Sequence, residues 1–323
     1  MLKTPLLFII FNRIDTTKQV FAKIKEVKPQ QLFIAADGPR KDRLGEEKKC
    51  KAVREWVLSQ IDWDCKVHTL FREENLGCGQ GPAQAITWFF DNVEQGIILE
   101  DDCVPTTSFF YYCEALLNYY KHDTHIMHIA GDNPLIRTNC DGATYYFASV
   151  QHCWGWASWA RAWKYFNFNI ECNFSKDFKN NTYFNNFNVR DFWMHALSQV
   201  REAKTVAWDY QWSWAILKQN GRCINPALNQ ITNIGCNSEG THFSDDTDKS
   251  SVERPRYEFS TINHPKSMKV NKRLQKKINE KLGIRYKTYL QLFGEKLVFL
   301  LKKILKHIGL FDFFKRLIKG IAS

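Results

Sequence analysis

The amino-acid sequence predicts an α/β protein whose central sheet is mostly parallel, Rossmann-like, and flanked by helices. Three observations support this fold class. Short apolar runs alternate with segments of helical spacing through the first 130 residues. The apolar runs are continuous, as strands must be when both faces of a parallel sheet are buried. Polar residues directly follow most of these runs, as expected at the edge of a parallel sheet where ligands bind.

The expected elements follow from these patterns in chain order. Each expected strand is a short, mainly apolar run, and the runs cover residues 6–11, 32–36, 67–71, 96–99 and 126–129. Each expected helix has apolar positions three or four residues apart, and these segments cover residues 16–27, 46–61, 80–93 and 108–120. The glycine-rich stretch 77–81 lacks the Lys-Ser/Thr pair of a phosphate-binding loop, so we interpret it as a turn before the third helix.

The formal charge of +11 is confined to the C-terminal part of the chain. Residues 266–323 contain 16 Lys and Arg against three acidic residues, whereas the other 265 residues contain 29 basic and 31 acidic side chains. The body is therefore close to neutral. This argues against a nucleic-acid-binding protein with a basic face on its folded domain.

The basic tail predicts a separate function from the body. We expect a domain over 1–244, with a nucleotide-binding half at about 1–130 and an acceptor half at about 131–244, then a polar linker over 245–270. In 271–323, apolar and aromatic residues recur at helical spacing opposite lysines. This pattern is typical of amphipathic helices that bind an anionic membrane surface. The alternative is a helix packed on the body with a solvated lysine face.

Cysteine usage and the N-terminal sequence predict the compartment. Ten cysteines occur without a CxxC pair or zinc-ligand spacing, and the N-terminus lacks the layout of a signal peptide. No apolar stretch approaches the ~20 residues needed to cross a bilayer. We therefore expect free thiols and a cytoplasmic protein, peripheral on the inner face of the cell membrane.

An acidic triplet, Glu100-Asp101-Asp102, directly extends the fourth expected strand. Three adjacent carboxylates repel one another unless a cation or hydrogen-bond donors compensate them. Mg²⁺ and Mn²⁺ prefer carboxylate oxygens and commonly share their remaining positions between water and substrate phosphates. The triplet therefore predicts a site for a metal and a diphosphate, with a merely acidic turn as the alternative.

Two stretches carry a resemblance to a known family. Residues 96–110 (Gly-Ile-Ile-Leu-Glu-Asp-Asp-Cys-Val-Pro-Thr-Thr-Ser-Phe-Phe) resemble the metal-binding region of GT-A glycosyltransferases, in particular the N-acetylglucosaminyltransferase I family. The stretch 208–212 (Trp-Asp-Tyr-Gln-Trp), followed by 221–226, 234–235 and His242, resembles that family's catalytic-base region. The chain departs from the family in having one acid where the family has a pair, and one extra residue before the Gly-Arg that follows.

The resemblance implies a GT-A fold and a metal-dependent, inverting glycosyltransferase. Such an enzyme would move a sugar, for example GlcNAc, from a UDP-sugar to a hydroxyl of a glycan or lipid-linked acceptor in surface polysaccharide or lipopolysaccharide synthesis. By resemblance, Asp102 binds Mn²⁺ or Mg²⁺, Asp101 contacts the donor sugar and Glu100 the ribose. Asp37 is expected to read the uracil edge, and Arg13 lies at the matching nucleotide-side position. As an alternative, Asp37 with the following glycine forms an ordinary turn.

The remaining expected site residues lie in the second half of the chain. Asp209 is the expected general base, and the alternative is a residue that starts a helix. The stretch Trp154-Gly155-Trp156 is the expected sugar-side element, although tryptophans at 156, 159 and 163 have helical spacing and are typical of a core. His242 is expected to touch the diphosphate, with a plain surface histidine as the alternative.

Two other functions stay open from the sequence. A sugar-1-phosphate nucleotidyltransferase of related fold would need a glycine-rich basic loop after the first strand, and residues 11–15 contain no glycine. A noncatalytic basic protein that binds membranes through its tail is the alternative from another class.

Overall fold

The computed structural model describes residues 1–203, 207–235 and 254–286, with 288, 290, 291, 293, 294 and 297 of the C-terminal part. His242 and most of the expected tail helices lie outside the described residues. The chain forms two compact units, Met1–Leu282 and Gly283–Ser323. In the described part of the second unit, Leu290, Phe293 and Leu297 have exposed side chains.

The first unit is built on an eight-stranded sheet in the order β3-β2-β1-β4-β8-β6-β9-β7. The strands are β1 (Leu6–Ile10), β2 (Gln31–Ala36), β3 (Lys66–Phe71), β4 (Gln95–Glu100), β6 (Ile126–Ala130), β7 (Tyr145–Ala148), β8 (Trp156–Trp159) and β9 (Arg222–Pro226). The first four pair in parallel, as do β6 and β9, whereas β8 runs antiparallel to β4 and β6, and β7 runs antiparallel to β9. A small antiparallel sheet joins β5 (Cys103–Pro105) to β10 (Ile231–Asn233).

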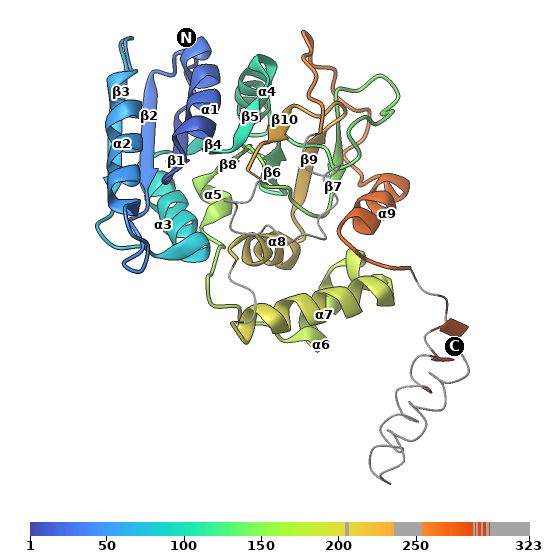
Figure 1. Ribbon diagram of the computed structural model, residues 1–323. Helices are drawn as coiled ribbons and strands as arrows, with labels where there is room; N and C mark the ends of the chain where they lie inside the picture. Colours follow the sequence, from blue (N-terminus) through green and yellow to red (C-terminus); the bar gives the residue numbers. More distant parts are fainter. Residues whose placement is uncertain are drawn as a thin grey trace, which may run out of the picture. The chain divides into compact units, whose positions relative to one another are not determined.

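Helices cover both faces of this sheet (Figure 1). The helices of the described residues are α1 (Ile14–Val27), α2 (Glu46–Ser59), α3 (Gly77–Asn92), α4 (Thr107–Tyr119), α5 (Ala160–Trp163), α6 (Phe174–Asp177), α7 (Phe187–Arg201), α8 (Asp209–Lys218) and α9 (Lys272–Lys281), with short 3-10 turns at Phe178–Asn180 and Thr182–Asn185. The predicted α/β class with a mostly parallel, helix-flanked sheet is confirmed.

The apolar runs are continuous because each strand contributes to two cores. Leu6, Phe8 and Ile10 of β1 pack in a cluster with residues of α1, α2 and α4. Leu7 faces the other way and packs with residues of α3 and α8. Successive side chains of a strand point to opposite faces, so a strand between two helical layers must be apolar at every position.

The glycine-rich stretch was assigned wrongly in the sequence prediction. Helix α3 begins at Gly77, so this stretch forms its first turn rather than a turn before it. The backbone N–H groups of Leu76 and Gly77 donate to the Asp37 carboxylate at 2.9–3.1 Å. These bonds satisfy donors that a helix start leaves without partners in the chain's own backbone.

The first unit also extends well beyond the predicted boundary at residue 244. The described part of the expected linker is attached to the body, because Glu258 accepts hydrogen bonds from the backbone N–H groups of Thr107 and Ser108 at 2.8 and 2.7 Å. In α9, Leu274 and Ile278 are buried with Tyr146 and Ala148 of β7, while the lysines of the helix are exposed. Residues 271–281 therefore form a packed helix of the body, which is the alternative that the sequence left open.

Two further structural facts concern the cysteines and the length of the helices. The nine cysteines within the described residues are all free thiols. Among the same residues, every helix is too short or too polar to traverse a bilayer.

Candidate active site

The acidic triplet lies at the carboxyl edge of the parallel half of the sheet. Strand β4 ends at Glu100, which is in register with Ile9 of the neighbouring strand β1. The residues that follow the two strands are thereby brought together. Arg13 forms ion pairs with Asp101 and with Asp102, the latter at 3.0 Å from Nη2 to Oδ2. The structure therefore places Arg13 on the triplet itself, as the cation that partly compensates it.

The electrostatics of the triplet follow from burial and mutual repulsion. Burial raises the pKa of Glu100 well above its usual range, and the charges of Asp102 and Asp101 raise it further. Burial also raises the pKa of Asp101, and Arg13 opposes this effect. One arginine thus offsets only part of the repulsion among three carboxylates. The site is suited to accept additional positive charge.

Asp209 lies near the same carboxylates. It is the first residue of α8, where a negative charge is favourable next to the helix N-terminus. Its charge contributes to the raised pKa of Glu100, after burial, Asp102 and Asp101. The structure thus brings Asp209 into the electrostatic range of the triplet, although about a hundred residues separate them in the chain.

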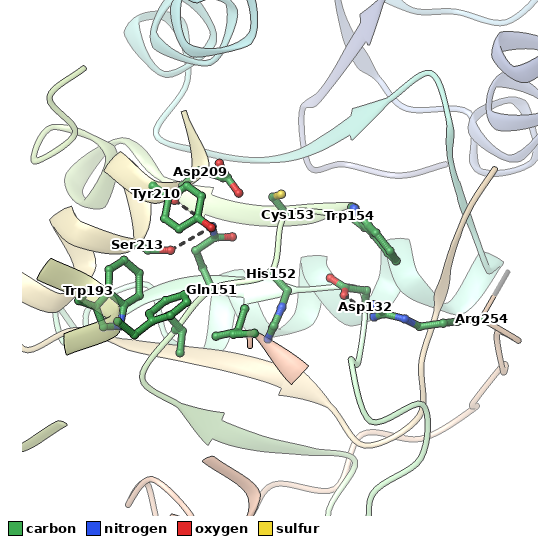
Figure 2. A pocket seen from close by; sticks show the side chains of 13 residues that line it. Asp132, Gln151, His152, Cys153, Trp154, Trp193, Asp209, Tyr210, Ser213 and Arg254 are labelled. Carbon is green, nitrogen blue, oxygen red and sulfur yellow. Dashed lines mark hydrogen bonds and ion pairs between the residues drawn. The ribbon is translucent and has the colours of Figure 1, made fainter. Parts of the chain in front are cut away.

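Asp209 also lines a pocket of about 200 Å³ between the end of the sheet and helices α7 and α8. Its wall includes Asp132, Gln151, His152, Trp154 and Arg254 (Figure 2). Arg254 Nη1 lies 3.2 Å from Asp132 Oδ2, and its guanidinium carbon lies 4.4 Å from the centre of the Trp154 ring. Trp154 therefore lines this pocket, and its role beside a sugar stays a prediction.

Trp156 is not part of this pocket, and its expected role beside a sugar is wrong. Its side chain has no solvent exposure and packs among Trp163, Trp208 and Trp212. The spacing of the tryptophans suggested a helix, but Trp156 lies in strand β8. The alternative prediction, that this tryptophan belongs to the core, was right. Gly155 has φ +61° and is so closely packed that a Cβ would lie 2.7 Å from Ile231 Cδ1. Glycine is required there for backbone reasons.

Asp37 has a structural role at the start of α3, and its expected contact with uracil stays a prediction. Both of its carboxylate oxygens accept backbone N–H groups at the start of α3, and Oδ1 also accepts from Gly38 N at 3.1 Å. A base edge would have to compete with these bonds. The presence of an aspartate directly after β2 is thus explained by its hydrogen bonds to the first turn of α3.

The donor set around Asp102 fits a particular kind of metal site. Its side chain is 14% exposed, and a Cβ on Gly235 would lie 2.0 Å from its Oδ2, so only glycine leaves room beside the carboxylate. Within the described ranges, no three His, Cys, Asp or Glu side chains are grouped to hold an ion. The residues fit Mg²⁺ or Mn²⁺ that takes one protein ligand and completes its shell with substrate phosphates and water.

Asp132, Gln151, His152 and Arg254 were missed by the sequence reasoning. Asp132 comes two residues after strand β6, so the rule that led to the acidic triplet could have found it. Arg254 gave no signal, because it falls in a polar segment that reads as a linker. Its role arises only from the path of the folded chain back to the pocket.

The state of Asp132 gives a testable pH dependence. Burial raises its pKa to about 6, and the attraction of Arg254 offsets this only in part. The folded protein therefore binds this proton more tightly than the unfolded chain does, so stability falls as the pH rises through the interval from about 4 to 6. We expect the free energy of unfolding of the wild type, relative to Asp132→Asn, to fall by on the order of 2–3 kcal/mol between pH 4 and pH 7. Urea unfolding of both proteins across this range measures it, and a flat difference would contradict it.

The fold and this site define an α/β protein with an acidic site at the carboxyl edge of its sheet, which one arginine partly compensates.

No protein-family model and no curated protein sequence matches the chain. Similar solved structures include the mannosyltransferase PcManGT from Pyrobaculum calidifontis in complex with GDP-Man and Mn²⁺, with 15% identity, a TM-score of 0.34, and coverage of 48% of this chain and 44% of that one. Others are TarS 1–349 from S. aureus (9% identity, TM-score 0.28, coverage 42% and 36%) and HddC from Yersinia pseudotuberculosis (8%, 0.31, 49% and 77%).

The chain spans less than half the length of the first two of these proteins. At such identities and TM-scores the similarity assigns no activity to this chain. Its function has to be argued from the site.

Proposed function

We propose that this protein is a metal-dependent glycosyltransferase that moves a sugar from a UDP-sugar to an acceptor hydroxyl with inversion. The observation that carries the proposal is the convergence of Glu100, Asp101, Asp102 and Asp209 at one edge of a parallel sheet, where Arg13 forms ion pairs with Asp101 and Asp102. Carboxylates in excess of their cation favour a ligand that brings positive charge. In a metal–diphosphate complex, the divalent cation brings that charge to the carboxylates.

The chain's own residues would handle the leaving group as follows. Asp102 supplies one oxygen ligand, and Arg13 holds the Asp101 and Asp102 side chains in orientation through its two ion pairs. Phe11 N donates to Asp101 Oδ2 at 3.2 Å, which fixes that carboxylate further. When bound, the divalent cation supplies electrostatic stabilisation of the charge that develops on the departing diphosphate.

Asp209 would act on the other substrate. An inverting displacement needs a general base within hydrogen-bond reach of the acceptor hydroxyl, on the side opposite the leaving group. Asp209 lines a pocket, lies at a helix N-terminus that favours its negative charge, and lies near the triplet without belonging to it. It would accept the hydroxyl proton on a carboxylate oxygen as the new glycosidic bond forms.

Binding of the donor tests the proposal most directly. A ligand that binds only the folded state stabilises it by about 3 kcal/mol at a hundredfold excess over Kd, a rise in melting temperature on the order of 5 °C for a protein of this size. We expect a UDP-sugar with Mn²⁺ or Mg²⁺ to give such a rise in a thermal-shift experiment, and ATP with the same metal to give none. A screen in which no UDP-sugar raises the melting temperature with either metal would refute the nucleotide site.

We also propose that the protein is cytoplasmic and binds the inner face of the cell membrane through its C-terminal unit. The support is the segregated positive charge of the sequence together with the exposed Leu290, Phe293 and Leu297. Anionic lipids attract basic segments by about 1 kcal/mol per Lys or Arg near the surface. We expect the full chain to sediment with vesicles containing phosphatidylserine and not with phosphatidylcholine vesicles, and the chain ending at Leu282 to stay in solution with both. Equal sedimentation of the two proteins would contradict this role.

A further inference from the structure

The pocket beside Asp209 contains polar groups that the proposed chemistry does not use. Asp132 has 3% exposure, and its Oδ1 has no hydrogen-bond partner among the described residues. The same holds, within that part of the chain, for Gln151 Oε1 and His152 Nε2. Trp193 Nε1 at the same pocket is a fourth such atom. Buried polar atoms nearly always have partners, so four of them around one pocket require an explanation. A ligand with several hydrogen-bonding groups would provide it.

The structure holds this wall rigidly. Gln151 Nε2 donates to Ser213 Oγ at 3.2 Å and to the backbone oxygen of Asp209 at 3.1 Å, which leaves its Oε1 oriented as an acceptor (Figure 2). His128 Nε2 lies 2.9 Å from the His152 oxygen, and Trp212 Nε1 donates to His128 Nδ1 at 3.2 Å. The histidine ring therefore donates to residue 152 and fixes the backbone there. Groups fixed before binding lose little entropy when a ligand arrives.

The charges of the pocket select the class of ligand. Asp132 and Asp209 carry potential negative charge, and Arg254 is paired with Asp132, so an anion would meet repulsion and a cation would meet the guanidinium. A neutral ligand rich in hydroxyl groups meets neither. Its O–H groups can donate to Asp132 Oδ1 and Gln151 Oε1, and its oxygens can accept from donors on the wall.

Size and shape narrow the class further. A volume of about 200 Å³ lies below the range of roughly 300–1,000 Å³ that is usual for sites enclosing drug-sized ligands. A whole nucleotide sugar is too large for it, whereas one sugar ring is not. Trp154, Trp193 and Tyr210 contribute aromatic surface, which suits the apolar C–H face of a pyranose.

We propose that this pocket is the acceptor subsite and that the acceptor is a sugar, with its hydroxyl groups held by Asp132 and Gln151 and its reacting hydroxyl facing Asp209. The assignment to the acceptor rests on the proposed function, because it takes Asp209 as the base. Asp132 and Gln151 are specificity-determining residues in this arrangement, and neither belongs to the acidic triplet. Arg254 positions Asp132 and covers one face of Trp154.

Binding of simple sugars to the full chain tests this inference without knowledge of the natural acceptor. The probes are the methyl glycosides of glucose, galactose, mannose and N-acetylglucosamine, observed by saturation-transfer NMR in the presence of UDP and the diamagnetic ion Mg²⁺. We expect the wild type to bind at least one of them, and Asp132→Asn to weaken that binding about tenfold or more, as for loss of a hydrogen bond to a charged group. Gln151→Leu should weaken it as well, which covers the case in which Asp132→Asn does not fold. Asp91→Asn, an exposed acid on α3, is the matched control and should bind as the wild type does.

The outcomes separate the sources of the sugar. Unchanged UDP affinity by calorimetry together with weakened glycoside binding supports an acceptor subsite. The proposal is overturned if the wild type binds no glycoside, or if both pocket variants bind it as tightly as the wild type does. A third outcome is that the pocket variants bind the glycoside as the wild type does and bind UDP normally, but bind the UDP-sugar more weakly. This outcome would assign the pocket to the donor sugar and would also overturn the proposal. If the wild type fails to bind UDP while glycoside binding still depends on Asp132, the proposed function is wrong and the sugar pocket stands.

Discussion

Replacing Asp209 by asparagine is expected to slow sugar transfer by a factor of about 10²–10⁴, the contribution typical of a positioned general base. Asparagine keeps the shape of the side chain at the start of α8 but cannot accept the proton of the acceptor hydroxyl. The binding of the UDP-sugar with metal should be nearly unchanged, because burial and the charges of Asp102 and Asp101 affect Glu100 more than the charge of Asp209 does. The effect should therefore fall on kcat and leave the KM for the donor close to that of the wild type.

The measurement is release of UDP at saturating donor and metal, with the methyl glycoside that binds best as acceptor. Asp91→Asn serves again as the matched control, since it makes the same chemical change on an exposed part of α3. The pH profile adds a second readout. An essential base gives a rate that rises with pH in the wild type, and the variant should lose that limb. If Asp209→Asn keeps more than half of the wild-type rate, another group is the base.

Replacing Asp102 by asparagine is expected to lower transfer by a factor of about 10²–10³, as for loss of one preorganised electrostatic contact to developing charge. The Asp102 carboxylate is 14% exposed and lies between Arg13 and the backbone of Gly235. The amide is a weaker ligand for Mg²⁺ or Mn²⁺ and brings no charge. The fold should tolerate the change, because Arg13 keeps its ion pair with Asp101.

The two variants should differ in a way that separates their roles. Asp102→Asn should abolish the metal-dependent part of the thermal shift given by a UDP-sugar, whereas Asp209→Asn should retain it. Melting curves without ligand provide the control for folding. Full transfer activity of a folded Asp102→Asn protein would remove the metal site from the proposal.

The strands and helices of the first 130 residues were predictable because each is specified by local sequence. A continuous apolar run indicates a strand buried on both faces. In β1, Leu6 and Phe8 pack in one cluster, and Leu7 packs in the cluster on the opposite side of the sheet. The rule that ligands bind beyond the ends of parallel strands also located Arg13 and the triplet. These features depend on the period and composition of short segments, which the sequence displays directly.

The second half of the sheet was not predictable in this way. Strand β8 inserts antiparallel between β4 and β6, and its tryptophans at 156 and 159 also fit a helical period, because a spacing of three residues occurs in both arrangements when both faces are buried. Similarly, the sequence of α9 is typical of a basic amphipathic helix that binds a membrane surface, but in the structure Leu274 and Ile278 pack against β7. An amphipathic pattern indicates that a face will be covered but not what covers it.

The sequence by itself determined that this protein is α/β, that its positive charge is separate from its body, and that an acidic triplet extends a buried strand. Only the tertiary structure decided that Arg13 pairs with that triplet, that Asp37 fixes a helix start, and that Asp132 and Arg254 meet at a pocket with Asp209. The physical reason is the range of the interactions involved. Strand and helix patterns arise between neighbours in the chain, whereas charge pairs and pockets form between residues that are brought together only when the chain folds.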